Sequence, residues 1–593
     1  MSDAIAHRGP DGETYFTSPS AMAYFAHRRL CVIDPSPAGS QPFQYNDRFT
    51  IMHNGEIYNY LELKKELEKL GFLFHSKSDT EVIVAAYQMY GKDCLQHFDG
   101  MFAFVIWDEK EKILFMARDR FGEKPLFFHY DQQKQFLCFA SEMKALWSIG
   151  ISNKLNPGLL LQYLALGYRN DIEGNHTYYD SISQIPPAHY AIYDPQNYSG
   201  IQLAPYWDLD KEKTIDISIS AAVDRLNELL TASVAKRLRT DVPPGATVSG
   251  GLDSSSLLAI ATGNLNLKLP CFSAVFAGFK NEMEYVELLK KQFNNIHHYT
   301  IPNAEGFVAD FEKLLYHQEQ PFSSTSVYAQ FKVFELAKQN KITVLLDGQG
   351  ADEIFGGYMR YIIAYLREIL SISGRQAFQR ERSAIQQNGS VMEWSWKHTL
   401  AATFPYQASR YLARKEKSKL KDATLFTKEF LASYSDSQQL YKPVVEKLND
   451  LMYYNIRQNG LPELLRYADR NAMAHSTEAR MPFLDHKLVE FIFLLPSSFK
   501  IHKGWTKWIL RKAIEPVLPS AITWRKEKIA FEPPQKDWMN SKQVMELIHL
   551  AKEKLVKEKI IQSSVLTKKI QPHDAYAAEN YDWRYLVTGS LLT

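Results

Sequence analysis

Apolar and polar positions in the first part of the chain alternate in the way that is typical of paired strands. Residues 101–118 form two apolar runs around a charged turn, and residues 125–140 repeat this plan. Each of these segments predicts a β-hairpin. Apolar positions with helical spacing predict helices over Tyr60–Leu70 and Asp79–Tyr90. Ser78 or Asp79 would serve as the N-cap of the second helix.

The pattern changes after residues 154–210, a segment with several prolines that predicts an irregular connection. Beyond it, a helical stretch at 218–238 is followed by short apolar strands that alternate with helices, and 360–480 is predicted to be mostly helical. Alternating strands and helices predict a parallel sheet covered by helices. We therefore expect a β-rich domain over residues 1–190 and an α/β domain over residues 211–593. The predicted strands of the second domain are Ala246–Ser249, Cys271–Phe276 and Ile342–Leu346.

Composition narrows the class of protein. The chain has 593 residues with 69 Lys and Arg against 67 Asp and Glu, so its net charge of +2 does not favour a nucleic-acid partner. Apolar residues make up 45%, but no run approaches the ~18 residues that span a membrane. There is no signal-peptide pattern at the start. We therefore expect a cytoplasmic enzyme with neither disulfides nor a zinc site, because no two cysteines are closely spaced. The cysteines are Cys31, Cys94, Cys138 and Cys271.

A glycine-rich segment carries the clearest chemical information. Residues 245–255 (GATVSGGLDSS) end a predicted strand and open a helix. Two glycines at such a turn let the backbone N–H groups approach an anion closely. Asp253 would repel a bare phosphate, so we expect Mg²⁺ between them. Neither the Walker nor the Rossmann glycine pattern is present, and the segment resembles the pyrophosphate loop of the ATP-pyrophosphatase family.

A second glycine-rich turn follows the next predicted strand. Residues 341–353 (KITVLLDGQGADE) run from a strand into two acidic residues. Ligands of an open parallel sheet bind at the carboxyl ends of its strands, so Asp352 and Asp253 could share Mg²⁺ on the pyrophosphate. Alternatively, the acids only stabilise a helix N-terminus. Lys507, which lies between tryptophans, could neutralise the departing phosphates or extend over apolar surface.

Taken together, the motifs resemble glutamine-hydrolysing asparagine synthetases over nearly the full length of the chain. The first part contains AHRGPDG (6–12), AHRRLCVID (26–34), HNGEIYN (53–59) and SDTEV (78–82). The second part contains SGGLDSS (249–255), DGQGADEIFGGY (347–358), RYADRNAMAHSTEARMPFLD (466–485) and KWILRKA (507–513). The resemblance implies ATP, Mg²⁺, aspartate and glutamine or ammonia as cofactors and substrates. It also implies an aspartyl-adenylate intermediate, an internal ammonia channel and a homodimer as an open possibility.

The resemblance further implies a fold and a set of site residues. The first domain would be an αββα glutaminase sandwich of the N-terminal-nucleophile type, and the second an ATP-pyrophosphatase domain. Arg29 would bind the glutamine carboxylate, and Glu56 and Asp79 the α-amino group. Asn54 and Gly55 would form the oxyanion hole. The strand beside the glutamine would contribute Leu30, Cys31, Val32 and Ile33. ATP would contact Val248, Ser249, Gly250, Gly251, Leu252, Asp253, Ser254, Val275, Asp347 and Gly348, with Gln349 and Lys507 in catalytic roles.

The sequence departs from the family pattern at two points. The family glutaminase uses a cysteine directly after the initiator Met, whose own α-amino group acts as base, whereas this sequence begins at Met1-Ser2, close to the HRGPD motif. Ser2 aligns with a later helix and is not expected to be the nucleophile. Either the true start lies upstream with a Met-Cys-Gly sequence, or the chain cannot hydrolyse glutamine and uses free ammonia. Gln349 stands where many relatives carry Glu, and an amide cannot take up a proton.

Three other interpretations remain open. An amidotransferase of this family could act on another carboxylate, such as a sugar acid or a peptide side chain. A chain similar to β-lactam synthetase would close an amide intramolecularly, but that predicts a decayed glutamine pocket. A non-catalytic homologue that binds partners would not need the acidic and basic residues of the phosphate loops. An asparagine synthetase is therefore the leading hypothesis.

Overall fold

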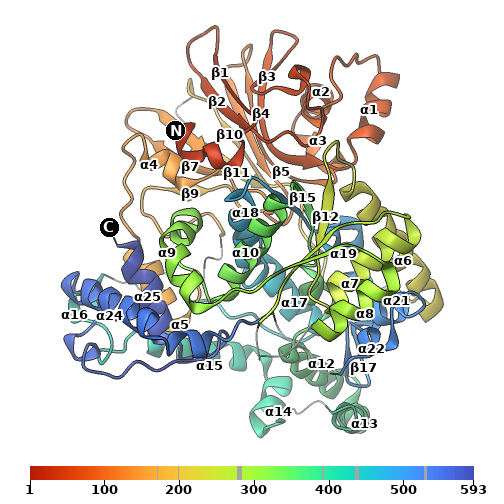
Figure 1. Ribbon diagram of the computed structural model, residues 1–593, viewed down its shortest axis with the longest axis vertical. Helices are drawn as coiled ribbons and strands as arrows, with labels where there is room; N and C mark the ends of the chain where they lie inside the picture. The colour runs from red at the N-terminus through yellow and green to blue at the C-terminus, as the bar shows by residue number, and fades with distance from the viewer. Residues whose placement is uncertain are drawn as a thin grey trace.

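The computed structural model describes residues 1–169, 171, 173–197, 200–276, 283–389, 393–433, 440–526 and 531–592. A β-rich body built from the start of the chain lies against a larger body of helices around a sheet (Figure 1). The first body contains a six-stranded antiparallel sheet in the order β11-β10-β6-β5-β4-β3. Its strands are β3 (Phe43–Tyr45), β4 (Phe49–Ile57), β5 (Gly100–Asp108), β6 (Ile113–Arg118), β10 (His189–Tyr193) and β11 (Ile201–Pro205).

Four layers make up this first body. Helices α1 (Tyr60–Lys69) and α2 (Asp79–Tyr90) share a buried apolar cluster with one face of the six-stranded sheet. The opposite face shares a cluster with a second β layer, which contains β2 (Tyr24–Arg29), β7 (Phe127–Asp131) and β8 (Phe136–Ala140). Helices α4 (Met143–Trp147) and α5 (Pro157–Leu166) cover the outside of β7 and β8. The predicted αββα sandwich is therefore confirmed.

Most of the predicted local elements of this body are also confirmed. β5 pairs with β6 and β7 with β8 as antiparallel hairpins. The hydroxyl of Ser78 accepts a hydrogen bond from the backbone N–H of Thr80 at 3.2 Å, so Ser78 is the N-cap of α2.

The expectation of an irregular connection over 154–210 is wrong in part. This segment holds α5, β9 (Ser183–Gln184), β10 and β11, and the last two strands join the six-stranded sheet. Pro157 occupies the first turn of α5 and Pro205 ends an edge strand, two places where a missing N–H is tolerated. The prolines therefore mark the ends of elements rather than their absence.

The second body is built on a five-stranded sheet in which every pair is parallel, as predicted. Its order is β14-β13-β12-β15-β16, and residues 360–480 between its last two strands are mostly helical. Figure 1 shows α10 (Ser326–Gln339) and α18 (Leu461–Met473) on one side and α6 (Ile219–Arg237) and α7 (Leu252–Ala259) on the other. The strands are β12 (Pro244–Thr247), β13 (Cys271–Ala274), β14 (His297–Thr300), β15 (Val344–Leu346) and β16 (Glu478–Arg480).

The register of the parallel sheet determines where its loops meet. Ala246 of β12 pairs with Leu346 of β15 on one side and with Cys271 of β13 on the other. Because the strands are parallel, the loops that follow them leave at the same edge of the sheet. Within the described ranges, no helix is long and apolar enough to cross a membrane.

Candidate active site

The two glycine-rich turns come together at this edge of the sheet. A Cβ atom at Gly348 would lie 3.1 Å from the backbone nitrogen of Ser254 and 3.3 Å from Cβ of Asp253. Gly348 therefore permits the loop after β15 to contact the first turn of α7. Gly250 adopts a φ of 72°, a left-handed conformation that glycine adopts without strain. The sequence-based prediction that the two turns are neighbours is confirmed.

Lys507 joins the two turns through its charge. Its Nζ lies 2.6 and 2.5 Å from the two carboxylate oxygens of Asp253 and 2.7 Å from Oδ1 of Asp352. Burial by itself would lower the pKa of Lys507, but the two carboxylates outweigh it and raise that pKa. The side chain is 7% exposed, so it does not extend over the surface, and the second of the two interpretations of Lys507 is wrong.

The other residues predicted to contact ATP lie at the carboxyl ends of β12, β13 and β15 and in the first turn of α7. Ser249 donates its backbone N–H to Oγ of Ser254 at 3.1 Å, and Oγ of Ser249 accepts from the N–H of Gly251 at 3.3 Å. These bonds order the turn before α7. Val248 follows β12, Leu252 is the first residue of α7, and Val275 follows β13.

Asp347 organises the second turn. One of its carboxylate oxygens accepts the backbone N–H of Gln349 at 3.2 Å. Burial raises the pKa of Asp347 to about 6, against the opposing effect of backbone hydrogen bonds from Gln349 and Gly348. The side chain of Gln349 is half-buried.

The chemistry of these donors fits Mg²⁺. Asp253 and Asp352 both contact the same lysine nitrogen, so their carboxylates lie close enough to act on one ion. Mg²⁺ in nucleotide sites is held by one or two carboxylates, and substrate phosphates and water complete its oxygen shell. No cluster of three or more His, Cys, Asp or Glu residues suited to a metal occurs in the part of the chain that the structure describes. A two-carboxylate site that depends on phosphate ligands is consistent with this.

A second site lies in the first body, where a cavity of about 600 Å³ opens between its two β layers. Apolar side chains such as Phe25, Val105 and Phe139 line its interior. All but one of the residues predicted to bind glutamine line it too; Cys31 is the exception among these described residues, and its backbone N–H bonds to Oδ2 of Asp11 at 2.8 Å. Those that line it are Arg29, Leu30, Val32, Ile33, Asn54, Gly55, Glu56 and Asp79.

Buried carboxylates give one end of this cavity an acidic character. Glu56 is 5% exposed, and its Oε2 has no hydrogen-bond partner among the residues that the structure describes. Burial, together with the neighbouring Asp79 and Glu478, raises the pKa of Glu56 well above its usual range. Burial also raises the pKa of Asp79 to about 6. A buried carboxylate oxygen without a partner is suited to accept a hydrogen bond from a cationic ligand group such as an ammonium.

Donors lie elsewhere in the cavity wall. Gly55 has a φ of 128°, and a Cβ atom there would lie 2.0 Å from the carbonyl oxygen of Met101, so only glycine fits this position of β4. Asn54 donates its Nδ2 to Oγ of Ser141 at 3.4 Å. Arg29 donates Nη1 to the carbonyl of Ser36 at 2.8 Å and Nη2 to the carbonyl of Asp34. These bonds fix the Arg29 guanidinium at the rim.

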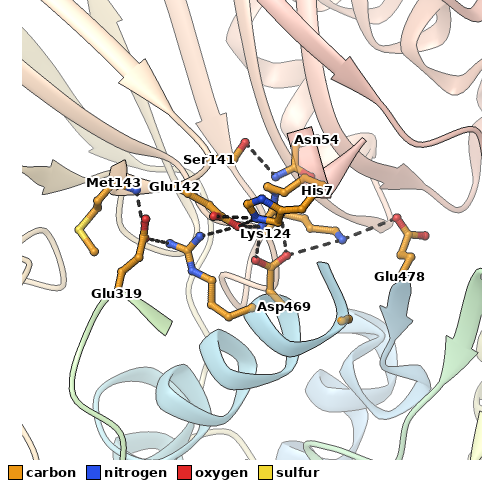
Figure 2. A network of polar contacts seen from close by, with 12 residues as sticks. His7, Asn54, Lys124, Ser141, Glu142, Met143, Glu319, Asp469 and Glu478 are labelled. Atoms are coloured by element: carbon orange, nitrogen blue, oxygen red, sulfur yellow. Dashed lines mark hydrogen bonds and ion pairs between the residues drawn. The ribbon is translucent and has the colours of Figure 1, made fainter. Parts of the chain in front are cut away.

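A buried network of charges connects the two bodies (Figure 2). Arg8 of the first body reaches Glu142 at 2.9 Å and Asp469 of α18 at 2.9 Å, while Arg470 reaches Glu142 at 3.0 Å and Glu319 at 2.8 Å. Arg8 and Asp469 belong to two of the sequence motifs, residues 6–12 and 466–485, but the sequence alone predicts no role for either residue. The sequence does contain one indication of this network. Asp469 and Arg470 are adjacent opposite charges in α18, a helix whose other face is apolar.

Sequence comparisons agree with this architecture. A profile described as glutamine amidotransferase domain matches residues 1–207, and one described as asparagine synthase matches residues 225–591. Three Bacillus subtilis (strain 168) proteins are similar over most of their length. "Asparagine synthetase [glutamine-hydrolyzing] 1" is 29% identical over 98% of this chain and 90% of its own, and number 3 is 31% identical over 89% and 82%. Number 2 is 30% identical over 90% of this chain and 68% of its own.

Fold and sequence together define the class of protein: an αββα sandwich that matches the glutamine amidotransferase profile, joined to a domain with a five-stranded parallel sheet that matches the asparagine synthase profile. The chain belongs to the asparagine synthase family.

Proposed function

We propose that the chain is a ligase that converts aspartate to asparagine with ATP and with nitrogen from glutamine or free ammonia. The aspartate side-chain carboxylate attacks the α-phosphorus of ATP and displaces pyrophosphate, which gives an aspartyl-adenylate. Ammonia then attacks the acyl carbon, AMP leaves with the electron pair of the broken C–O bond, and the nitrogen loses a proton. The observation that carries this proposal is the meeting of Asp253, Asp352 and Lys507 at two glycine turns.

Each residue of this cluster has a role in the proposed reaction. Lys507 is cationic and buried, so it would balance the negative charge that develops on the departing pyrophosphate. The backbone N–H groups at the start of α7 would bind phosphate oxygens. Asp253 and Asp352 would hold Mg²⁺, which when bound supplies electrophilic stabilisation of the phosphates. Gln349 would hydrogen-bond the reacting groups without exchanging a proton with them.

The cavity of the first body would serve as the glutamine site. Glu56 and Asp79 would bind the α-ammonium group, and Arg29 the carboxylate. Asn54 and Gly55 would donate hydrogen bonds to the oxyanion that forms during hydrolysis. A cytoplasmic location and a homodimer stay predictions.

One assay tests the synthetase reaction and its acceptor. Purified protein is incubated with ATP, Mg²⁺ and ammonium chloride, and pyrophosphate release is measured with aspartate, glutamate or a sugar acid as acceptor. We expect aspartate-dependent pyrophosphate together with asparagine detected by mass spectrometry. Pyrophosphate release that depends on another carboxylate, while aspartate fails, would contradict aspartate as the acceptor.

Asp253→Asn provides the matching test of the site. Loss of one of the two carboxylates should weaken Mg²⁺·ATP binding and lower pyrophosphate release by at least about 100-fold, on the scale of removing one major electrostatic contact from a reaction site. Asp224→Asn, an exposed change on α6, is the control and should keep full activity. Circular dichroism verifies that both variants are folded. Normal pyrophosphate release by Asp253→Asn would refute the role of this carboxylate.

A further inference from the structure

One arginine of the second body reaches the acidic end of the cavity in the first body. Arg480 is the last residue of β16 and is completely buried. Its guanidinium lies 2.8 Å from Oε1 of Glu478 and 3.5 Å from Oε1 of Glu56. Glu56 therefore has its nearest cationic partner in the other domain.

The guanidinium is held in place by atoms that do not belong to the cavity. Its Nη1 donates to the carbonyl oxygens of Arg237, the last residue of α6, at 2.9 Å and of Arg239, two residues further on, at 2.7 Å. A guanidinium fixed at several points cannot easily follow a carboxylate that moves. The Glu56 carboxylate therefore pairs with a guanidinium whose own position is fixed.

The backbone of the same residue touches the other site. The carbonyl oxygen of Arg480 accepts the backbone N–H of Asp347 at 2.9 Å, at the start of the glycine turn that follows β15. One residue of β16 therefore makes a backbone hydrogen bond to the proposed nucleotide loop and an ion pair with the carboxylate of the proposed glutamine site.

We propose that Arg480 is a positioning residue of the glutamine site, which holds the Glu56 carboxyl group in the place needed to bind the α-ammonium group of the amino acid. This inference rests on the proposed function of the cavity. It means that the glutamine site is complete only when the synthetase domain is docked against it.

The charges around Glu56 explain why an arginine is needed there. Burial and the acidic neighbours Asp79 and Glu478 favour the protonated form of Glu56. The cations Arg480 and Lys124 favour the ionised form. A protonated carboxyl group cannot form an ion pair with an ammonium group. Removal of the Arg480 charge therefore raises the pKa of Glu56 further and weakens amine binding. The titratable and charged groups that face this site are Asp79 of α2, His53 of β4, Lys124 before β7, and Glu478 and Arg480 of β16.

The test compares two ligands that differ only in the α-amino group. L-glutamine and 4-carbamoylbutanoate, which lacks that group, are titrated into the full chain by calorimetry, and glutamate formation is measured in the same samples. The variants are Arg480→Gln, Arg480→Lys, Glu56→Gln and the Arg480→Gln/Glu56→Gln double variant. Arg584→Lys is the control, because Arg584 is another buried arginine of the second body that donates to carbonyl oxygens of the first, those of Leu164 and Ala165, and it is not among the residues that line the cavity.

We expect Arg480→Gln and Glu56→Gln each to weaken glutamine binding by about tenfold or more, the scale of a charge-assisted hydrogen bond. The double variant should be no weaker than Glu56→Gln, because the two residues act through one contact. Binding of 4-carbamoylbutanoate should change less than about twofold throughout, as should binding of both ligands to Arg584→Lys. The pH midpoint below which glutamine binding is lost should move to higher pH in Arg480→Gln and less in Arg480→Lys.

Other outcomes would contradict either the positioning role of Arg480 or the glutamine site itself. Additive losses in the double variant, equal losses for both ligands, or an unchanged pH midpoint would overturn the positioning role and leave only a structural one. If Arg480→Gln is unfolded by circular dichroism, Arg480→Lys carries the same comparison, and a normal glutamine affinity and pH profile for it would overturn the inference. If the unaltered protein binds neither ligand, the proposed glutamine site itself is refuted, and this inference with it.

Discussion

Gly357 shows how closely the groups around Lys507 are packed. A Cβ atom at this position would lie 1.9 Å from Oδ1 of Asp352 and 2.3 Å from Cε of Lys507. Neither side chain can move away without lengthening the 2.7 Å contact between Nζ of Lys507 and Oδ1 of Asp352. The requirement for glycine is therefore a requirement for space rather than for a special backbone angle.

We expect Gly357→Ala to reduce pyrophosphate release by about 100-fold or more, because the lysine must leave the carboxylates and the phosphates that it is proposed to neutralise. The protein should stay folded, since the methyl group enters the site and not the core. Gly263→Ala is the matched control, because a Cβ atom there has nothing within 4 Å. Activity of Gly357→Ala equal to that of the control would show that Lys507 does not need its observed position.

Sequence reasoning at this scale identified the residues but could not decide between their roles. Lys507 had two interpretations because its local neighbours are apolar, and its partner Asp253 is 254 positions away. Contacts of that kind depend on how the chain folds back and leave no local pattern. Cys31 stays a prediction: its neighbours in the sequence line the cavity, whereas Cys31 is not among the lining residues.

At the scale of elements, helix α2 places Asp79 at the cavity wall. Asp79 is its first residue, and one carboxylate oxygen of Asp79 accepts the backbone N–H of Ile57 at 2.8 Å. The cap at Ser78 fixes where the helix begins and hence where this carboxylate lies.

Ser78→Ala should lower the free energy of unfolding by about 1 kcal/mol, the usual value for a lost N-cap, and should also weaken glutamine binding. Ser218→Ala removes the equivalent cap from α6, where Oγ of Ser218 accepts the N–H of Ala221 at 3.2 Å, and serves as the control. Urea denaturation and glutamine titration are measured for both variants. The two changes should cost similar stability, but only Ser78→Ala should affect glutamine. Equal glutamine affinity in the two variants would contradict a positioning role for this cap.

Long elements with a regular pattern could be predicted, whereas short ones could not. The helices over 60–70 and 79–90 and both hairpins follow from periodicity, because one face of each is buried. Strand β16 has only three residues, Glu478–Arg480, two of them charged, so it lacks the apolar run of a central strand. Its charges are buried because Glu478 and Arg480 pair with each other and with Lys124 and Glu56 of the other body, and the local sequence does not encode those distant partners.

At the scale of the whole molecule, the sequence predicted two domains but not how they dock. The interface is held by ion pairs of two kinds. Glu142 is 1% exposed and contacts Arg8, Arg470, Lys144 and His7. By contrast, the pair between Arg239 of the second body and Glu62 of the first is largely exposed on the Glu62 side. These two carboxylates allow the contributions of buried and exposed charge to be compared within one interface.

Glu142→Gln should destabilise the protein by about 3–5 kcal/mol, because several buried cations would lose their shared counter-ion. Glu62→Gln, which removes an exposed interdomain pair, should cost at most about 1 kcal/mol. High salt should abolish the small effect of Glu62→Gln and leave that of Glu142→Gln largely unchanged, since buried pairs are poorly screened. Urea denaturation of both variants at low and high NaCl measures this. Similar, salt-sensitive losses in the two variants would mean that solvent reaches the network and that it does not fix the domains against each other.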